Sequence, residues 1–172
     1  MELSGDSPVL IAPELVEAAT DLGARLRERG WRVATAESLT GGAIAATLTA
    51  VAGSSDYMAG GLVTYQTEQK IRQLDVSITL IERHGVVSEE VAIAMAVGAA
   101  QRFGVDCAIA VTGVAGPAGP EDDHPVGTVW VATSVRDDVR ALCYAFGEVG
   151  RDGVRLATVK AALRQLGNQI DA

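Results

Sequence analysis

Two short stretches hold the side chains whose types and spacing could carry out a reaction: "AESLTGG" at residues 36–42 and "TYQTEQK" at residues 64–70. Lys70 is one of only two lysines among 14 basic residues. Arginine effectively never gives up its proton, whereas a desolvated lysine can, so a neutral Lys70 could serve as the base for a Ser38 nucleophile. Tyr65, five residues before the lysine, could relay a proton or donate a hydrogen bond to a developing negative charge. On the residues alone, a helix-capping serine, a surface lysine and a tyrosine at a rim are an open alternative.

Glycines beside the serine and in a second loop could hold an anion. Gly41 and Gly42 would lie in the first turn of a helix, where unpaired amides and the helix dipole favour negative charge. In "AVTGVAGPAGP" (110–120) an apolar run enters Thr112-Gly113 and then a loop of small residues, which lets a ligand approach the backbone. A tight turn and an ordinary mobile loop are the alternatives. The serine stretch matches neither a dinucleotide fingerprint nor a P-loop, and it lacks the GxSxG elbow of hydrolases.

Two arginines on the last expected helix are further candidates for binding a phosphate. A metal site is not expected. Arg151 and Arg155 are four residues apart and therefore share a helix face, from which they could reach a phosphate or form surface ion pairs. The chain has two histidines far apart in sequence and no CxxC pair. The three adjacent carboxylates at 121–123 are typical of a solvated loop, so we expect no bound metal.

The bulk composition bounds the class of protein. The 172 residues suit one domain with its own core, and 48 % apolar with 21 % charged residues is a globular composition. The net charge of −8 argues against nucleic acid as a partner. We expect neither a signal peptide nor a membrane span, because no basic leader or long uncharged apolar stretch is present. Cys107 and Cys143 lie in apolar runs and are expected to be buried free thiols, which fits a cytoplasmic location.

A frame of alternating helices and strands must position these residues. Hydrophobic spacing and the placement of glycine and proline predict helices over 13–29, 42–51, 67–73, 77–84, 88–103 and 150–166, and strands over 31–36, 57–65, 107–111, 128–135 and 139–146. Residues 1–12 are expected to form a flexible arm and 13–172 a single domain. The order of the elements predicts an α/β fold, a three-layer α/β/α sandwich with a mixed, mostly parallel sheet. Ser38 would then stand at the carboxyl end of a strand, where open α/β sheets bind ligands.

Five stretches, in order and spacing, resemble the C-terminal domain of the CinA (competence/damage-inducible) family. They are "AESLTGG", "GGLVTYQTEQK", "HGVVSEEVA", "AVTGVAGPAGP" and "HPVGTVWVA", and the resemblance spans about residues 13–167. Standalone members of this family are known as nicotinamide-nucleotide amidases. The resemblance therefore implies a three-layer α/β/α fold and the conversion of nicotinamide mononucleotide to nicotinate mononucleotide and ammonia, without a metal or an organic cofactor.

The resemblance also implies roles for individual residues. Ser38 would be the nucleophile, acting with Lys70 and Tyr65. The glycine-rich stretches would line the nucleotide site, and Arg151 is added to them as a candidate for the phosphate; together the expected substrate-binding residues are Thr40, Gly41, Gly42, Thr112, Gly113, Ala115, Gly116 and Arg151. The sequence does not decide which stretch holds the phosphate and which holds the oxyanion.

Three positions depart from the family pattern: Leu39 where cysteine is usual, Thr67 where asparagine is usual, and Ala118 where glycine is usual. The residues with chemical roles remain, so the reaction class is kept, and the orientation of the substrate near Thr67 is open. A non-catalytic nucleotide- or phosphate-binding module and an interaction protein linked to competence or DNA damage are the alternatives. A small-molecule nucleotide is the expected partner, with no nucleic acid or membrane, and a homo-oligomer, with a dimer favoured, is expected.

Overall fold

A computed structural model of the chain describes residues 11–117 and 124–172. Over these residues the fold is built on one sheet with strand order β2-β1-β3-β4-β5. Its strands are β1 (Val33–Glu37), β2 (Met58–Val63), β3 (Cys107–Gly113), β4 (Thr128–Val135) and β5 (Asp138–Ala145). β1 pairs parallel with β2 and β3, whereas β4 pairs antiparallel with β3 and β5. β5 therefore runs in the same direction as β1 to β3, and β4 alone of these strands opposes the others.

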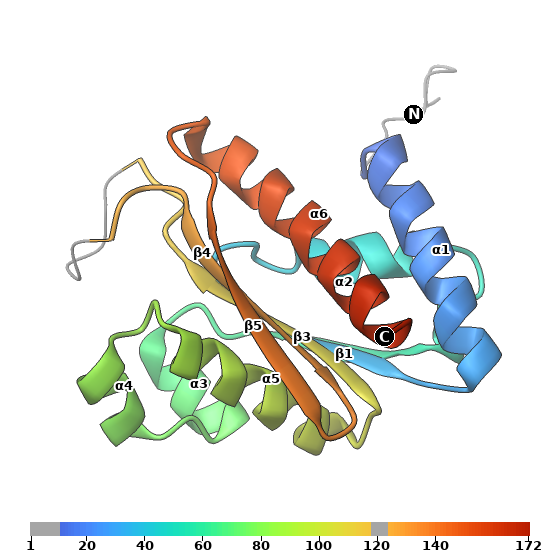
Figure 1. The fold of residues 1–172 in the computed structure, drawn as a ribbon, viewed down its shortest axis with the longest axis horizontal. Helices are drawn as coiled ribbons and strands as arrows, with labels where there is room; N and C mark the ends of the chain where they lie inside the picture. The colour runs from blue at the N-terminus through green and yellow to red at the C-terminus, as the bar shows by residue number, and fades with distance from the viewer. Residues whose placement is uncertain (1–10, 118–123) are drawn as a thin grey trace, which may run out of the picture.

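Helices cover both faces of this sheet (Figure 1). One face carries α1 (Pro13–Arg29), α2 (Ala43–Thr49) and α6 (Gly150–Ile170), and the other carries α3 (Thr67–Leu74), α4 (Ile78–His84) and α5 (Glu89–Phe103). A short 3-10 helix spans Ser54–Asp56. Alternate residues of a strand point to opposite faces, so Ile109 of β3 packs in one core cluster while Ala108 and Ala110 pack in the other. The expected three-layer α/β/α sandwich is confirmed.

Turn-forming residues set the ends of the elements. Pro13 starts α1, and Gly30 ends it in the left-handed conformation at φ 63°. The amides of Gly30 and Trp31 still donate to carbonyls of that helix end, so β1 begins at Val33, later than the expected strand start. α6 continues to Ile170, beyond the expected end, and the other elements lie in the stretches where they were expected.

The three parallel strands end at the same edge of the sheet, at Glu37, Val63 and Gly113. Glu37 is paired with Val63 in the β1–β2 register, so the segments that follow these two strands start side by side. This carboxyl edge is where open α/β sheets bind ligands. Among the described residues, no helix has the length and apolarity that crossing a membrane requires.

The expectation that both cysteines are buried is wrong for one of them. Cys107 on β3 is buried, and burial raises the pKa of its thiol to about 12, so it acts as a small packing residue. Cys143 is exposed because β5 is an edge strand and its apolar run does not lie inside the core. Both thiols are free, as expected.

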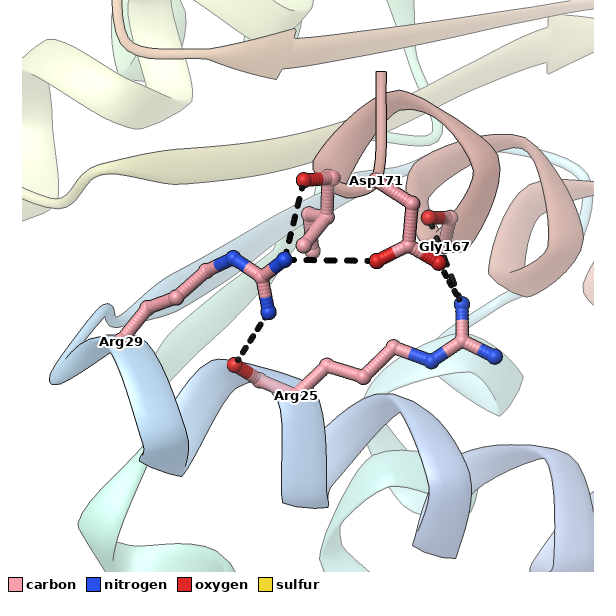
Figure 2. Close-up of polar contacts among 5 residues, drawn as sticks. Arg25, Arg29, Gly167 and Asp171 are labelled. Atoms are coloured by element: carbon pink, nitrogen blue, oxygen red, sulfur yellow. Dashed lines mark hydrogen bonds and ion pairs between the residues drawn. The ribbon is translucent and has the colours of Figure 1, made fainter.

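Two arginines of α1 fasten the C-terminal end of α6 (Figure 2). Arg25 Nη1 lies 2.6 Å from Asp171 Oδ2, and Arg29 Nη2 donates to Asp171 Oδ1 at 3.4 Å and to the Ile170 carbonyl at 3.3 Å. Arg25 also reaches the Gly167 carbonyl at 3.5 Å. Positive charge is favourable at a helix C-terminus, so this clasp of Arg25, Arg29 and Asp171 joins α1 to α6.

Candidate active site

Ser38 stands directly after β1, at the carboxyl edge of the parallel strands. The chain turns back behind it through Gly41 (φ 62°) and Gly42 (φ 97°), backbone conformations that favour glycine. The Gly41 amide donates to the Ser38 carbonyl at 3.1 Å, and α2 begins at Ala43. The two glycines thus form a tight turn that keeps the serine at the start of a helix.

Lys70, in the first half of α3, brings its amine to this serine. Nζ donates to the Thr64 carbonyl at 2.7 Å, to Ser38 Oγ at 3.2 Å and to the Tyr65 carbonyl at 3.4 Å. The lysine is 0 % exposed, and burial lowers the pKa of its amine from 10.5 to about 8. A neutral amine that keeps its two N–H groups on the two carbonyls directs its lone pair at the Ser38 hydroxyl. The pair therefore has the geometry of a nucleophile and its base.

A buried carboxylate, that of Glu37, lies at the start of α2. Its Oε2 accepts from the amides of Gly42 and Ile44, both at 3.0 Å, and its Oε1 accepts from the Ala45 amide at 2.8 Å and from Thr35 Oγ1 at 3.1 Å. Glu37 is 0 % exposed. Burying a charge is costly unless it is hydrogen-bonded, and these donors satisfy both oxygens.

This arrangement changes the expected role of the two glycines. The amide of Gly42 donates to Glu37 and that of Gly41 donates to Ser38, so both amides already have acceptors within the chain. Contact of Gly41 and Gly42 with a substrate stays a prediction. Within the described chain, the amides of Leu39 and Thr40 have no hydrogen-bond acceptor. They are the unpaired amide donors of this turn, in residues that are 4 % and 0 % exposed.

Tyr65 lies at the rim of the site. Its side chain is 57 % exposed, and its hydroxyl accepts from Arg151 Nη2 at 3.1 Å, while Arg151 Nη1 donates to the Gly116 carbonyl at 2.8 Å. The contact between Tyr65 and Lys70 runs through the tyrosine carbonyl. A proton relay through the tyrosine hydroxyl therefore stays a prediction.

Arg155 lies one turn beyond Arg151 on α6. It donates to the Thr40 carbonyl at 3.1 Å, and its ion pair with Asp152, at 3.4 Å, involves a carboxylate side chain that is 96 % exposed. Arg151 has no carboxylate partner among the residues that the structure describes. Arg155 thus lies against the serine turn, and Arg151 lies against Tyr65 and the loop after β3. Two weakly neutralised guanidinium groups suit a phosphate.

The end of β3 contributes to packing rather than to an open site. Thr112 Oγ1 donates to the Val86 carbonyl at 2.9 Å. A Cβ on Gly113 would lie 2.6 Å from the Thr128 carbonyl oxygen, so glycine is required by the close approach of β4. The expected contacts of Thr112 and Gly113 with a substrate stay predictions.

The loop after β3 reaches the site through its backbone. Ala115 is 4 % exposed and packs in the core cluster beneath α6, while the Gly116 carbonyl holds Arg151. Their direct contact with a substrate also stays a prediction. Ala118 and the acidic residues 121–123 lie outside the described residues.

The departures from the family pattern at 39 and 67 take no part in the hydrogen bonds of the serine–lysine pair. Leu39 is 4 % exposed and belongs to the core cluster that also contains Ile44 and Leu48. Thr67 is exposed at the first position of α3. The change at 39 therefore affects packing behind the turn, which the sequence could not distinguish from a change in the site.

Two buried hydroxyl groups beside the site have no hydrogen-bond partner among the described residues, Thr40 Oγ1 and Thr64 Oγ1. The Thr64 backbone is fully used, because its amide donates to the Glu37 carbonyl at 2.8 Å and its carbonyl accepts from Lys70. Leaving a buried hydroxyl unsatisfied costs about 1–3 kcal/mol, and both threonines are 0 % exposed, so each holds an unmet hydrogen-bonding capacity next to the site.

The site as a whole combines a serine hydroxyl, a buried amine base, two amide donors and two guanidinium groups. Such a set can attack a carbonyl carbon and hold an anionic group nearby. In the described part of the chain, no group of three His, Cys, Asp or Glu residues is placed to hold a metal ion. Sequence reasoning found the dyad but left Glu37 unassigned; a carboxylate that ends an apolar strand just before a helix was the available signal.

Comparison with known proteins relates the chain to one family. The model of the CinA C-terminal domain matches residues 16–170. A CinA-like protein of Syntrophobacter fumaroxidans is 46 % identical over 142 residues, which is 83 % of this chain and 33 % of that protein. This chain thus spans about a third of the length of the curated relatives it matches.

Solved structures of proteins with the same type of name share the fold of this chain. The competence/damage inducible protein CihA from Agrobacterium tumefaciens has a TM-score of 0.90 at 39 % identity and covers 95 % of this chain and 99 % of that one. A CinA superfamily protein from Klebsiella pneumoniae has a TM-score of 0.88 at 36 % identity and covers 91 % of this chain and 98 % of that one.

Proposed function

The chain belongs to the family of the CinA C-terminal domain, and on that premise we propose that it is an amidohydrolase that converts nicotinamide mononucleotide to nicotinate mononucleotide and ammonia. The observation that carries the proposal is the 3.2 Å contact between Lys70 Nζ and Ser38 Oγ. A general base must come within hydrogen-bond reach of the proton it removes, and this base is buried, with a lowered pKa. The identity of the substrate comes from the family resemblance.

The reaction begins with acylation of the serine. Neutral Lys70 takes the hydroxyl proton as Ser38 Oγ bonds to the carboxamide carbon, and the carbonyl oxygen becomes an oxyanion. The Lys70 ammonium returns that proton to the amide nitrogen as the C–N bond breaks. Ammonia leaves, and the nicotinoyl group remains on Ser38 as an ester.

Hydrolysis of the ester completes the cycle. Lys70, neutral again, takes a proton from a water molecule whose oxygen bonds to the ester carbon. The bond from the carbon to Ser38 Oγ then breaks, and Oγ recovers a proton from the Lys70 ammonium. The product is the carboxylate, and all steps use this chain's residues and water.

We assign the oxyanion to the amides of Leu39 and Thr40. They follow the nucleophile directly, and they have no acceptor among the described residues. The amide after a serine nucleophile is a recurring oxyanion donor in hydrolases. One such donor is worth roughly 3 kcal/mol of transition-state stabilisation.

We assign the phosphate of the mononucleotide to Arg151 and Arg155. Both guanidinium groups border the serine turn or the loop after β3, and a dianion would replace neutral carbonyl and phenol acceptors as their partner. Guanidinium groups bind phosphate through paired N–H donors. This assignment predicts a preference for the mononucleotide over the uncharged riboside.

The deciding experiment incubates the protein with nicotinamide mononucleotide and measures ammonia and nicotinate mononucleotide together. The wild-type protein is expected to release both in equal amounts, and Ser38→Ala, checked for folding by thermal denaturation, is expected to release neither. Near-wild-type turnover by Ser38→Ala would exclude the serine mechanism. Stabilisation by the mononucleotide without turnover in the wild type would instead identify a non-catalytic binding module.

A further inference from the structure

We propose that Glu37 is a positioning residue for the nucleophile: its carboxylate fixes the turn that holds Ser38 against Lys70. The kinetic part of this proposal rests on the proposed amidohydrolase function. The structural part rests only on the contacts of Glu37 and can be tested through the reactivity of Ser38.

The start of α2 is capped by a side chain that lies outside the N-cap position. A helix start is ordinarily capped by a serine, threonine, aspartate or asparagine at the N-cap position itself. Here the N-cap is Gly42, at φ 97°, and it has no side-chain hydrogen bond. The cap comes from Glu37, on the other side of Ser38, so the hydrogen bonds from Gly42, Ile44 and Ala45 close a ring of chain that contains the serine.

Burial of the Glu37 carboxylate is energetically costly. Glu37 is fully buried and forms no ion pair among the described residues. A buried carboxylate without a cation is tolerated when its oxygens are fully hydrogen-bonded, so the four donors and the turn that carries them are held to one geometry. A simple cap would need one oxygen; this one uses both.

The base, Lys70, is tied to the backbone of the same residue through Thr64. The Glu37 carbonyl accepts from the Thr64 amide at 2.8 Å, and the Thr64 carbonyl accepts from Lys70 Nζ at 2.7 Å. Lys70 in turn donates to Ser38 Oγ at 3.2 Å. The cycle Glu37–Thr64–Lys70–Ser38 closes through the backbone of Glu37, and the carboxylate of the same residue holds the turn on the other side of Ser38.

The test compares two substitutions that weaken the carboxylate contacts to different extents. Glu37→Gln keeps the size but turns an acceptor oxygen into an NH₂ group that faces amide donors. We expect kcat to fall about 100-fold, the loss that a displacement of about 1 Å can cause, with KM changed less than about threefold. Thr35→Val removes one of the four hydrogen bonds, and we expect a several-fold loss of kcat in a folded protein.

Two further measurements distinguish the loss of Ser38 positioning from a general loss of protein stability. The rate at which a fluorophosphonate probe labels Ser38, followed by mass spectrometry, reports the reactivity of the serine without any amide substrate, and it should fall in parallel with kcat. The control is Asp171→Ala, which breaks the clasp at the far end of α6 and should lower Tm while leaving kcat and labelling at the wild-type level.

The outcomes are distinct. Folded Glu37→Gln or Thr35→Val protein with wild-type labelling overturns the proposal, and Thr35→Val decides the matter if Glu37→Gln does not fold. Equal loss of labelling in Asp171→Ala also overturns it, because the effect would then follow stability. A wild-type protein that is labelled at Ser38 but releases no ammonia refutes the amidohydrolase function, and the labelling rates then judge the role of Glu37 on their own.

Discussion

Lys70 Nζ donates to Ser38 Oγ across 3.2 Å, and both side chains are buried, at 0 % and 9 % exposure. The contact exists because β1 and β2 are parallel neighbours with Glu37 opposite Val63. The segments that follow the two strands therefore meet at one edge of the sheet, and α3 folds back far enough to bring its lysine to the serine. Strand register thus brings two residues that are 32 positions apart in sequence into hydrogen-bond contact.

The rate of the proposed reaction should rise with pH through about 8. Lys70 acts as a base only when it is neutral, and burial lowers its pKa to about 8. We expect kcat/KM to increase tenfold per pH unit below that value and to level off above it. Measurements from about pH 7 to about pH 10 check this. Lys70→Arg, which stays charged, should lose about 10³-fold; a flat profile or an active arginine variant contradicts the assignment of the base.

Stability should also depend on pH through Lys70. The pKa of this amine is about 8 in the folded chain and 10.5 when unfolded, so the unfolded chain binds the proton more tightly. The free energy of unfolding therefore rises as pH increases from about 8 to about 10.5, by about 3 kcal/mol from this group. Lys70→Met lacks this contribution.

The measurement is denaturant unfolding of wild type and Lys70→Met at both ends of that pH range. The wild type should gain stability relative to the variant at the alkaline end. Lys160→Met is the matched control, because it removes an exposed lysine paired with Glu14, and it should follow the wild type. Parallel pH dependence of the wild type and Lys70→Met contradicts the prediction.

Arg151→Ala should weaken binding of the mononucleotide much more than that of the riboside. A hydrogen bond to a charged group contributes about 1.5–3 kcal/mol, so KM for the mononucleotide should rise at least about tenfold. The riboside has no phosphate and should be affected less. Steady-state kinetics with both substrates check this, with Arg164→Ala, an exposed arginine further along α6, as the control. Equal losses for the two substrates would place Arg151 elsewhere in the mechanism.

Leu39→Cys, which restores the usual family residue, should change stability rather than chemistry. Leu39 packs in the core at 4 % exposure, so the smaller side chain removes buried apolar volume and should cost about 1–3 kcal/mol. We expect kcat to stay within about twofold of wild type, because Leu39 packs in the core cluster with Ile44 and Leu48 and takes no part in the hydrogen bonds of Ser38 and Lys70. Thermal unfolding and ammonia release measure the two effects, and a large gain in kcat with unchanged stability is the contrary result.

Most helices and strands could be predicted, because the residues that begin, end or bury them lie within the elements or next to them in the sequence. Pro13 and Gly30 mark the ends of α1, and the apolar run after Cys107 is typical of a strand covered on both faces. The pairing of Ser38 with Lys70 could also be predicted, through the scarcity of lysine and the family resemblance. These features depend on residue type and spacing, which the sequence displays directly.

The contacts inside the site could not be predicted in the same way. The amides of Gly41 and Gly42 were expected to be free, but Glu37 and the Ser38 carbonyl take them, and only the folded turn shows this. Cys143 lies in an apolar run yet is exposed, because the position of β5 at the edge of the sheet is set by tertiary pairing. Hydrogen-bond partners and strand order arise from the whole fold.

The dyad, Glu37 and the two carbonyls that hold the lysine all come from one unbroken stretch of chain, 33–74, whereas Arg151 and Arg155 come from α6. Under the proposed function, bond breaking and recognition of the anion would therefore be encoded in separate segments. Substitutions at the start of α6 can change which amide is accepted while the reactive centre is inherited intact. Divergence of substrate within this family, and its redesign in the laboratory, should accordingly begin at that helix.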